Sequence, residues 1–329
     1  MEKLIAQFPK HISDALTAAR ETAFVSLNKA DFENVVICGM GGSGIGGRLI
    51  AQWFSGECSV PITLVQDYQV PSFVSNKTLV IGSSYSGNTE ETICAIEDAI
   101  RKGATIVAIS SGGELIKICK ENNFEYAKLP GGNPPRSMLA FSVVHLVNIF
   151  SQAKLISADS LDKINRCRHL LNNELIDIKS TAKKLASFSK GKQLVIYSSN
   201  QHEGVCVRLR QQFNENAKQL CWHHVLPEMN HNELVGWGGG NDKFAVLFIQ
   251  GRDMNEQLKL RFALTKEVVG KKTEHILELN AKGSSLIEET FYLIHAIDWA
   301  SIYLAEFNQQ DPMEIKVIEY LKSELEKIK

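Results

Sequence analysis

The sequence predicts an α/β protein in which parallel sheets are covered by helices on both faces. Near-continuous apolar strands that alternate with helices are typical of such sheets, because both faces of each strand are buried. In the first half of the chain, runs rich in Val and Ile lie at Val35–Cys38, Ile62–Val65, Leu79–Ile81 and Thr105–Ile109. The second half repeats this order, with runs at Gln193–Tyr197, Phe244–Ile249 and His275–Leu279.

Segments with helical periodicity follow these runs and divide the chain into two similar halves. A polar, charged stretch around residues 158–168 separates the halves. We therefore expect one domain over residues 1–152 and a second over residues 153–329. The helices are expected to begin near Gly44, Thr89, Glu114 and Met138 in the first half, and near Gly204, Met254 and Ser284 in the second.

The end of the chain predicts one more helix. Asp311-Pro312 is a pair that often opens a helix. The segment is expected to pack on one of the two domains through apolar residues at helical spacing, namely Ile315, Ile318, Leu321 and Leu325.

The composition favours a small-molecule partner. The 329 residues carry a net charge of −1 with 22% charged residues, so there is no broad field of one sign, and we expect neither nucleic acid nor a membrane surface as partner. Seven cysteines without a C-x-x-C pair favour reduced thiols over a disulfide framework. Because no apolar run is long enough to span a bilayer, the sequence predicts a cytoplasmic protein.

A glycine-rich loop follows the first strand. Gly42–Gly47 satisfies the G-x-G-x-x-G pattern between a strand and a helix, and Asp67 follows about 20 residues later at a strand end. This spacing is the one that a dinucleotide site requires. A nicotinamide-dependent oxidoreductase therefore stays open on the evidence of this loop alone.

A second loop is rich in hydroxyl groups. The segment Ser83–Thr89 reads Ser-Ser-Tyr-Ser-Gly-Asn-Thr and opens a helix. Short hydroxyl side chains and free N–H groups at a helix start can surround a terminal phosphate dianion with donors, although an ordinary helix cap has the same composition. We predict that Ser84, Ser86 and Thr89 bind a phosphate.

Two ionisable residues outside these loops are candidates for catalysis. Arg136 lies in a stiff loop of glycines and prolines just before a helix, where it could stabilise a developing oxyanion or be a plain surface arginine. Glu215 lies near the end of a predicted helix between two asparagines. A carboxylate flanked by amides can be held in one orientation and move a proton between adjacent carbons, although most helical glutamates are merely solvated.

His231 also lies between two asparagines, in a segment predicted to be a loop. Histidine titrates near neutral pH and is a candidate for acid and base steps in the opening of a sugar ring. A metal site at His223, His224 and Glu228 is the weaker idea, because their spacing matches no common metal motif.

Five motifs together resemble the bifunctional phosphoglucose/phosphomannose isomerases, which belong to the sugar-isomerase (SIS) domain proteins. The resemblance runs from about residue 35 to the C-terminus. The motifs occur in order at Gly41–Gly44, Ser84–Thr89, Pro135-Arg136, Phe213–Asn216 and Asn230–Glu233.

The resemblance implies two sugar-isomerase domains, each a flavodoxin-like parallel sheet flanked by helices. The active site would lie between them and at a dimer interface. In this family the hydroxyl loop, here Ser84, Ser86 and Thr89, binds the substrate phosphate, and Gly42 and Ser43 line the sugar side.

The resemblance also implies catalytic roles. Glu215 matches the base, Arg136 matches the arginine that steadies the enediolate, and His231 matches a histidine donated by the neighbouring subunit for ring opening. A lysine on the C-terminal helix contacts the region of the ring oxygen. Lys322 matches this lysine best, with Lys316 as the alternative.

The implied activity is metal-independent isomerisation of glucose 6-phosphate and mannose 6-phosphate to fructose 6-phosphate, with no cofactor and in a homodimer. Two other classes stay open. One is the NAD(P)-dependent oxidoreductase, and the other is a regulator that binds a sugar phosphate without catalysis. The joint presence of Glu215, His231 and Arg136 speaks against a mere regulator.

Overall fold

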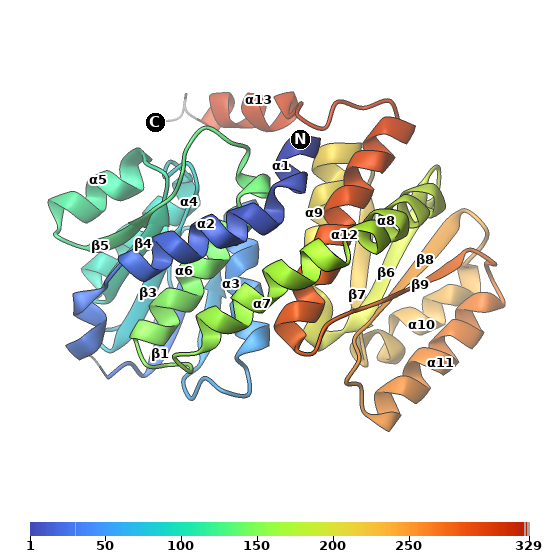
Figure 1. Ribbon diagram of the computed structural model, residues 1–329, viewed down its shortest axis with the longest axis horizontal. Coiled ribbons are helices and arrows are strands. Elements are labelled where there is room, and N and C mark those ends of the chain that lie inside the picture. Colours follow the sequence, from blue (N-terminus) through green and yellow to red (C-terminus); the bar gives the residue numbers. More distant parts are fainter. Residues whose placement is uncertain (30, 326, 328–329) are drawn as a thin grey trace.

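The computed structural model describes residues 1–29, 31–325 and 327, and it contains two parallel sheets (Figure 1). The first sheet has the order β2-β1-β3-β4-β5 and the second the order β7-β6-β8-β9. The first comprises β1 (Asn34–Cys38), β2 (Ile62–Val65), β3 (Thr78–Ser83), β4 (Thr105–Ser110) and β5 (Glu125–Lys128). The second comprises β6 (Gln193–Ser199), β7 (Cys221–Leu226), β8 (Phe244–Gln250) and β9 (Ile276–Asn280). The predicted α/β class with parallel sheets is confirmed.

Helices connect and cover the strands. None in the described part of the chain is both long and apolar enough to cross a membrane. Two short 3-10 segments, η2 (Pro135–Ser137) and η4 (Glu228–His231), carry predicted site residues. The α-helices are α1 (Glu2–Ala6), α2 (Phe8–Glu21), α3 (Gly41–Trp53), α4 (Glu90–Arg101), α5 (Gly113–Glu121), α6 (Leu139–Gln152), α7 (Ser160–Asn173), α8 (Leu175–Ser189), α9 (Glu203–Ala217), α10 (Glu233–Gly236), α11 (Glu256–Gly270), α12 (Leu286–Phe307) and α13 (Lys316–Leu325).

The sequence pattern misses two strands, β5 and β7, and several helices, among them α1, α2 and α7. Strands β5 and β7 lie at edges of their sheets and pair on one side only, so they form without a continuous apolar run. The polar stretch expected to separate the halves is mostly helix α7. This helix buries Ile164, Cys167 and Leu171 at helical spacing, while its other faces are polar.

Successive residues of a strand point to opposite faces of its sheet and pack into different hydrophobic cores. Val35 and Ile37 of β1 face a central core that also contains Leu194 and Ile196 of β6 and apolar side chains of α2, α3, α6, α9 and α12. Val36 faces the opposite way, into a smaller core under α4 and α5. The central core is shared by both sheets, and it therefore fixes their relative position.

Helices α3 and α9 pack against each other and run in opposite directions. Gln211 in α9 donates to the carbonyl of Gly41 at the start of α3 (3.3 Å), while Gln52 near its end donates to the carbonyl of Asn200 just before α9. Helix α3 starts where β1 ends, whereas α9 ends where β6 begins. The carboxyl edge of the first sheet therefore lies beside the end of α9, which carries Glu215.

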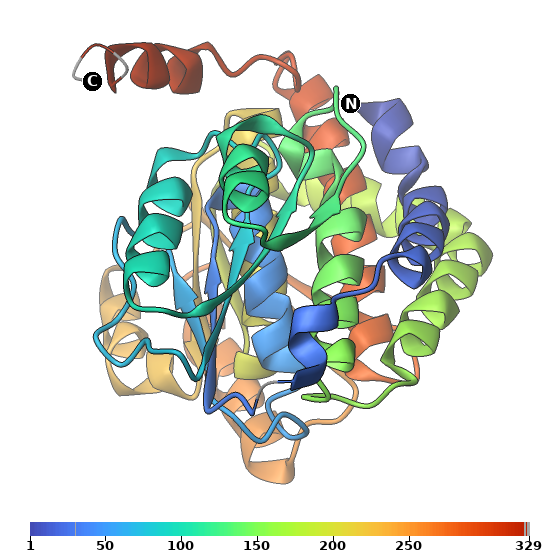
Figure 2. The ribbon, with the colours of Figure 1, turned by 90° about the vertical axis from the view of Figure 1, so that its left-hand side faces the viewer.

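The C-terminal helix differs from the expectation in two ways. It begins at Lys316 rather than at Asp311, because backbone carbonyls of the preceding turn accept hydrogen bonds from two cations. Lys218 Nζ donates to Asp311 (2.7 Å) and Glu314 (2.8 Å), and Arg136 Nη2 donates to Pro312 (2.6 Å). The expectation that this helix packs on one of the domains is wrong, because α13 has no buried residue and projects beyond the body (Figure 2).

Candidate active site

The hydroxyl loop joins β3 to α4 and forms one compact turn. Ser84 is buried, and its Oγ accepts from the Gly87 amide (3.1 Å) and shares a hydrogen bond with Thr89 Oγ1 (2.8 Å). Ser86 is exposed, and its Oγ accepts from the Asn88 amide (3.2 Å). The three predicted phosphate ligands thus meet at the start of α4, where backbone N–H groups and the helix dipole favour an anion.

The shape of this loop depends on one glycine. Gly87 has φ of +72°, and a Cβ atom at this position would lie 1.8 Å from the carbonyl oxygen of Gly112. A side chain is therefore excluded both by the left-handed backbone and by the neighbouring turn. The hydroxyl loop is held against the first residues of α5.

The start of α3 connects the hydroxyl loop to Arg136. Ser43 Oγ accepts from the amide of Tyr85 (3.0 Å), and Ser83 Oγ donates to the carbonyl of Ser43 (3.2 Å). On the other side, a Cβ atom at Gly42 would lie 3.2 Å from the backbone nitrogen of Arg136. Gly42 and Ser43 therefore lie between the phosphate loop and Arg136.

This packing bears on the dinucleotide interpretation of Gly42–Gly47. The backbone of Arg136 lies against Gly42, and Gln211 donates to the carbonyl of Gly41. Both groups thus cover the helix start at which a Rossmann site places its pyrophosphate. The glycines allow the chain to pack closely on itself at this helix start. The G-x-G-x-x-G pattern is therefore explained without a nicotinamide cofactor, and it was the main support for such a site.

Arg136 lies at the centre of the site and is 3% exposed. Its Nη1 lies 3.2 Å from Glu215 Oε2, its Nε donates to Asn216 Oδ1 (2.8 Å), and its Nη2 donates to the Pro312 carbonyl (2.6 Å). Burial lowers the pKa of Arg136, and the neighbouring Glu215 carboxylate opposes that shift. Residues far apart in the sequence thus converge on one guanidinium group.

The asparagines beside Glu215 do not act as the sequence suggested. Asn214 is exposed. Asn216 is buried, and besides accepting from Arg136 it donates to Ser301 Oγ (2.9 Å). Glu215 is therefore oriented by Arg136, and Asn216 acts on Glu215 only through that arginine.

Sequence reasoning also missed a buried network under Arg136. Arg208 Nε and Nη2 donate to the two oxygens of Asp298 (3.0 and 2.8 Å), and Arg208 Nη2 also donates to the carbonyl of Arg136 (2.7 Å). Gln212 donates to Asp298 Oδ1 (2.7 Å). The available signal was the helical spacing, since Arg208, Gln212 and Glu215 recur every three or four residues in α9. This network fixes the backbone that presents Arg136.

His231 does not lie with Glu215 in this chain. Glu215 is near the end of α9, whereas His231 follows β7, whose Leu226 pairs with Ser199 at the edge where α9 starts. The segment of α9 from Glu203 to Glu215, which contains 12 residue-to-residue steps, spans about 18 Å. Figure 1 shows α10, which follows His231, at the opposite end of the molecule from α13. His231 is exposed there.

The two candidate lysines lie on α13. Lys316 is its first residue, and Lys322 lies about 9 Å further along the helix. Both side chains are exposed. The turn before α13 is anchored on Arg136 through Pro312, so the helix starts beside the site and leads away from it.

The histidines considered for a metal have other partners. His224 Nδ1 lies 2.8 Å from Glu233 Oε2, and the other Glu233 oxygen accepts from the Tyr197 hydroxyl. His223 Nε2 lies 3.7 Å from Glu203 Oε1. The described residues contain no group of three or more His, Cys, Asp and Glu side chains placed to hold a metal ion.

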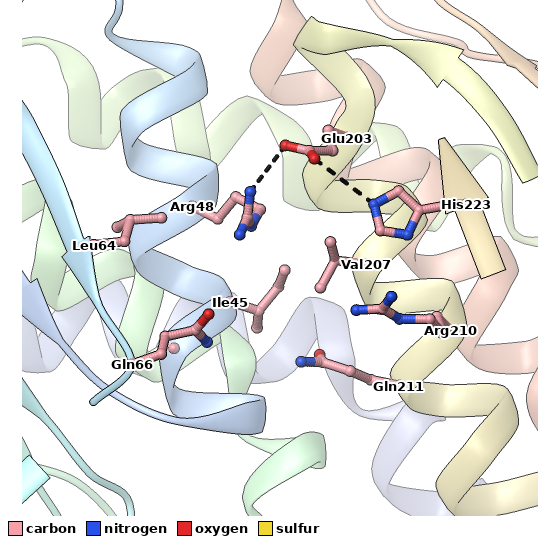
Figure 3. Close-up of a pocket in the computed structure, with 10 residues that line it drawn as sticks. Ile45, Arg48, Leu64, Gln66, Glu203, Val207, Arg210, Gln211 and His223 are labelled. Carbon is pink, nitrogen blue, oxygen red and sulfur yellow. Dashed lines mark hydrogen bonds and ion pairs between the residues drawn. The ribbon is translucent and has the colours of Figure 1, made fainter. Parts of the chain in front are cut away.

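A polar cavity of about 130 Å³ lies between α3 and α9 (Figure 3). Glu203 bridges Arg48 (2.8 Å) and His223 (3.7 Å) at this cavity, and Arg210 and Gln211 line its other side. None of the residues predicted to bind the sugar phosphate or to catalyse its reaction lines the cavity, although Gln211 lies one helical turn before Glu215. The neighbouring imidazole of His223 and the charge of Arg48 lower the pKa of Glu203.

Comparison with known proteins identifies the family. The model of a family described as the bacterial phospho-glucose isomerase C-terminal SIS domain matches residues 178–325. A bifunctional phosphoglucose/phosphomannose isomerase of Caldicellulosiruptor bescii is 32% identical, with both chains covered completely. The protein of the same name from Thermoplasma acidophilum is 35% identical over 91% of this chain and 92% of its own.

A solved structure shares the fold at low sequence identity. The C-terminal domain of glucosamine-fructose-6-phosphate aminotransferase from Francisella tularensis superimposes with a TM-score of 0.75 at 13% identity, covering 94% of this chain and 96% of that one. The two parallel sheets of this chain thus share the fold of that solved domain. Because this identity extends over the full chain, the protein belongs to the family of bifunctional phosphoglucose/phosphomannose isomerases.

Proposed function

We propose that the protein interconverts glucose 6-phosphate and mannose 6-phosphate with fructose 6-phosphate through a cis-enediol, without a metal ion. The proposal rests on one observation. A continuous path of contacts leads from the hydroxyl loop through Ser43 and Gly42 to Arg136 and Glu215. A phosphate binder and a carboxylate on one path can hold a phosphorylated sugar and act on its carbons.

The phosphate is bound by the hydroxyl loop. Ser84, Ser86 and Thr89 supply hydroxyl donors, and the free N–H groups at the start of α4 supply the rest. The substrate chain then extends over Gly42 and Ser43 toward Arg136. This placement is supported by the position of α3 between the two parts of the site.

Glu215 moves the proton. From the aldose, Glu215 removes the proton at C2, and the C1 carbonyl oxygen gains a proton to give the enediol. Glu215 then returns its proton to C1, while the hydroxyl on C2 loses its proton and becomes the ketone oxygen of the ketose. Charge develops on the enediol oxygens between these steps. Arg136, already within 3.2 Å of the Glu215 carboxylate, supplies a fixed positive charge for it.

One base can serve both aldoses. Glucose 6-phosphate and mannose 6-phosphate differ only in configuration at C2. If the enediol turns about the C2–C3 bond, Glu215 meets its other face and delivers the proton to give the other epimer. No second carboxylate is then required.

Ring opening needs a second copy of the chain. His231 follows β7 at the edge of the second sheet where α9 starts, whereas Glu215 lies about 18 Å further along that helix. We propose a homodimer in which His231 of one subunit enters the active site of the other and exchanges protons with the ring oxygen and its hydroxyl. Lys322, or Lys316 in its place, contacts the ring-oxygen region from α13.

The domain boundary near residue 152 is part of the same proposal. All strands of the first sheet precede it, and all strands of the second follow it. The seven cysteines are free thiols, which supports a reducing compartment such as the cytoplasm.

A coupled assay tests the proposed reaction. Purified protein is incubated separately with glucose 6-phosphate and mannose 6-phosphate, with and without a chelator, and fructose 6-phosphate is measured. Activity on both aldoses that survives chelation is expected. Activity that requires added NAD(P) would support the oxidoreductase, and binding without turnover would support the regulator.

A further inference from the structure

Helix α13 presents an apolar face that no described residue of its own chain buries. Val317 is 80% exposed and Leu321 57% exposed, and both lie on the side that continues to Leu325. Tyr320 and Ile318 are exposed as well. A helix of 10 residues is marginal by itself in water, and its apolar face normally packs against another surface.

The position of α13 is fixed at its base. Pro312 accepts from Arg136, and Lys218 Nζ donates to the carbonyls of Asp311, Glu314 and Glu215. These bonds attach the turn before the helix to the end of α9. A second chain that reaches Glu215 therefore also lies near the start of α13.

A complementary surface surrounds His231 at the other end of the molecule. Asn230, its neighbour, donates to Thr265 (2.8 Å) and accepts from Arg261 (3.3 Å), both on α11. Beside these two positions Leu260 and Leu264 are exposed, and Val235, four residues after His231, is 83% exposed. We call residues 228–236 together with Leu260 and Leu264 the His231 corner.

We propose that α13 packs its apolar face against the His231 corner of a second copy of the chain. The inference rests on the proposed function, because His231 reaches a Glu215 site only from another copy. A two-fold axis can place the His231 corner of each subunit against the Glu215 end of the other. The dimer then contains the contact between α13 and the His231 corner twice. The same contact orients Lys316 and Lys322, so the active site is incomplete without it.

Photo-crosslinking in mixed dimers tests the contact. A chain with ¹⁴N, in which Leu321 is replaced by p-benzoylphenylalanine, is mixed with ¹⁵N wild-type chain, irradiated and analysed by mass spectrometry. We expect crosslinked peptides that join ¹⁴N α13 to ¹⁵N residues of the His231 corner. Crosslinks only to ¹⁴N peptides of the same chain would overturn the inference, as would ¹⁵N crosslinks outside the corner.

Polar substitution gives an independent measurement. Val317→Ser with Leu321→Ser should raise the dimer dissociation constant at least about tenfold, since two apolar side chains lose their burial. Ile176→Ser is the matched control, because Ile176 is 88% exposed on α8, and it should leave the constant unchanged. An unchanged constant in the double variant would contradict the docking.

The outcomes separate this inference from the proposed function. If the protein is a dimer with isomerase activity but α13 crosslinks within its own chain, only the docking of α13 fails. If a monomer is fully active, the contribution of His231 from a second copy fails as well.

Discussion

Arg136 and Glu215 form an ion pair in which Nη1 lies 3.2 Å from Oε2. The arginine is almost fully buried, while 26% of the glutamate side chain is exposed. The pair therefore has a fixed cation on its inner side and a solvent-accessible carboxylate on its outer side. A substrate that enters from solvent meets the carboxylate first and the cation behind it, which suits a base paired with a stabiliser of negative charge.

Replacing Glu215 with Gln should remove the base and keep the shape of the site. We expect kcat to fall at least about 100-fold for both aldoses, because general base catalysis contributes on that scale. The change is measured in the coupled assay. Glu121→Gln, at an exposed glutamate of α5, is the control, and near-normal turnover by Glu215→Gln would exclude this carboxylate as the base.

Mixing two inactive variants should restore activity if His231 acts across subunits. Glu215→Gln and His231→Ala each lack one group, but a mixed dimer contains one intact site. Random exchange should then give about a quarter of the wild-type activity. A mixture no more active than its components would show that both groups act within one chain, or that His231 does not act in catalysis.

The phosphate loop predicts a selective effect on binding. Ser86 is exposed, and its Oγ accepts a hydrogen bond from the nearby Asn88 amide, so Ser86→Ala should leave the thermal unfolding temperature nearly unchanged. The loss of one hydroxyl donor to a dianion should raise KM about tenfold. Ser59→Ala, at an exposed serine outside the loop, serves as control. An equal KM in both variants would remove Ser86 from the phosphate site.

A buried histidine predicts how stability depends on pH. Burial lowers the pKa of His145 to about 4, whereas in the unfolded chain it is about 6.5. The unfolded state therefore binds more protons as the pH falls through this range, and stability decreases. His145→Leu should flatten the dependence of the free energy of unfolding between pH 6.5 and 4. His169→Leu, at an exposed position on α7, should retain the wild-type slope, and an equal slope in His145→Leu would contradict the prediction.

The ion pairs of Glu203 predict a second loss of stability in acid, in this case through a carboxylate. Its lowered pKa means that Glu203 stabilises the fold above its unfolded pKa of about 4.3 and that this contribution is lost as the pH falls through the lower folded value. Glu203→Gln should therefore cost about 1 kcal/mol at pH 7, where it breaks the bridge between Arg48 and His223. The cost should vanish in acid. A constant difference between the two proteins across this range, measured by denaturant unfolding, would exclude the electrostatic cause.

The sequence predicted the strands best where both faces are buried. Val35–Cys38 and Phe244–Ile249 are apolar throughout, so their composition is enough to indicate a strand. By contrast, β7 contains His223 and His224, because an edge strand has one side free for polar groups. No local pattern distinguishes such a strand from a loop.

The individual residues of the site could be predicted from the sequence, but the hydrogen bonds and ion pairs between them could not. Ser84 and Thr89 follow a strand and open a helix, so local chemistry indicated an anion site. The roles of Asn216, Arg208 and Asp298 depend on which side chains meet Arg136 after folding. Helical spacing indicates only that Arg208 and Glu215 share a face of α9, and it does not say which partners that face meets. The exposed face of α13 was missed for the related reason that helical periodicity does not say what covers a helix.

Incubation of fructose 6-phosphate in D₂O tests the central claim most directly. Wild-type protein should release glucose 6-phosphate and mannose 6-phosphate that carry deuterium at C2, visible by NMR, because a proton held on Glu215 exchanges with solvent before it is returned. Glu215→Gln should form neither labelled product at a comparable rate. Unlabelled aldoses from the wild type, as a direct hydride shift would give, or full labelling by the variant, would contradict proton transfer by Glu215.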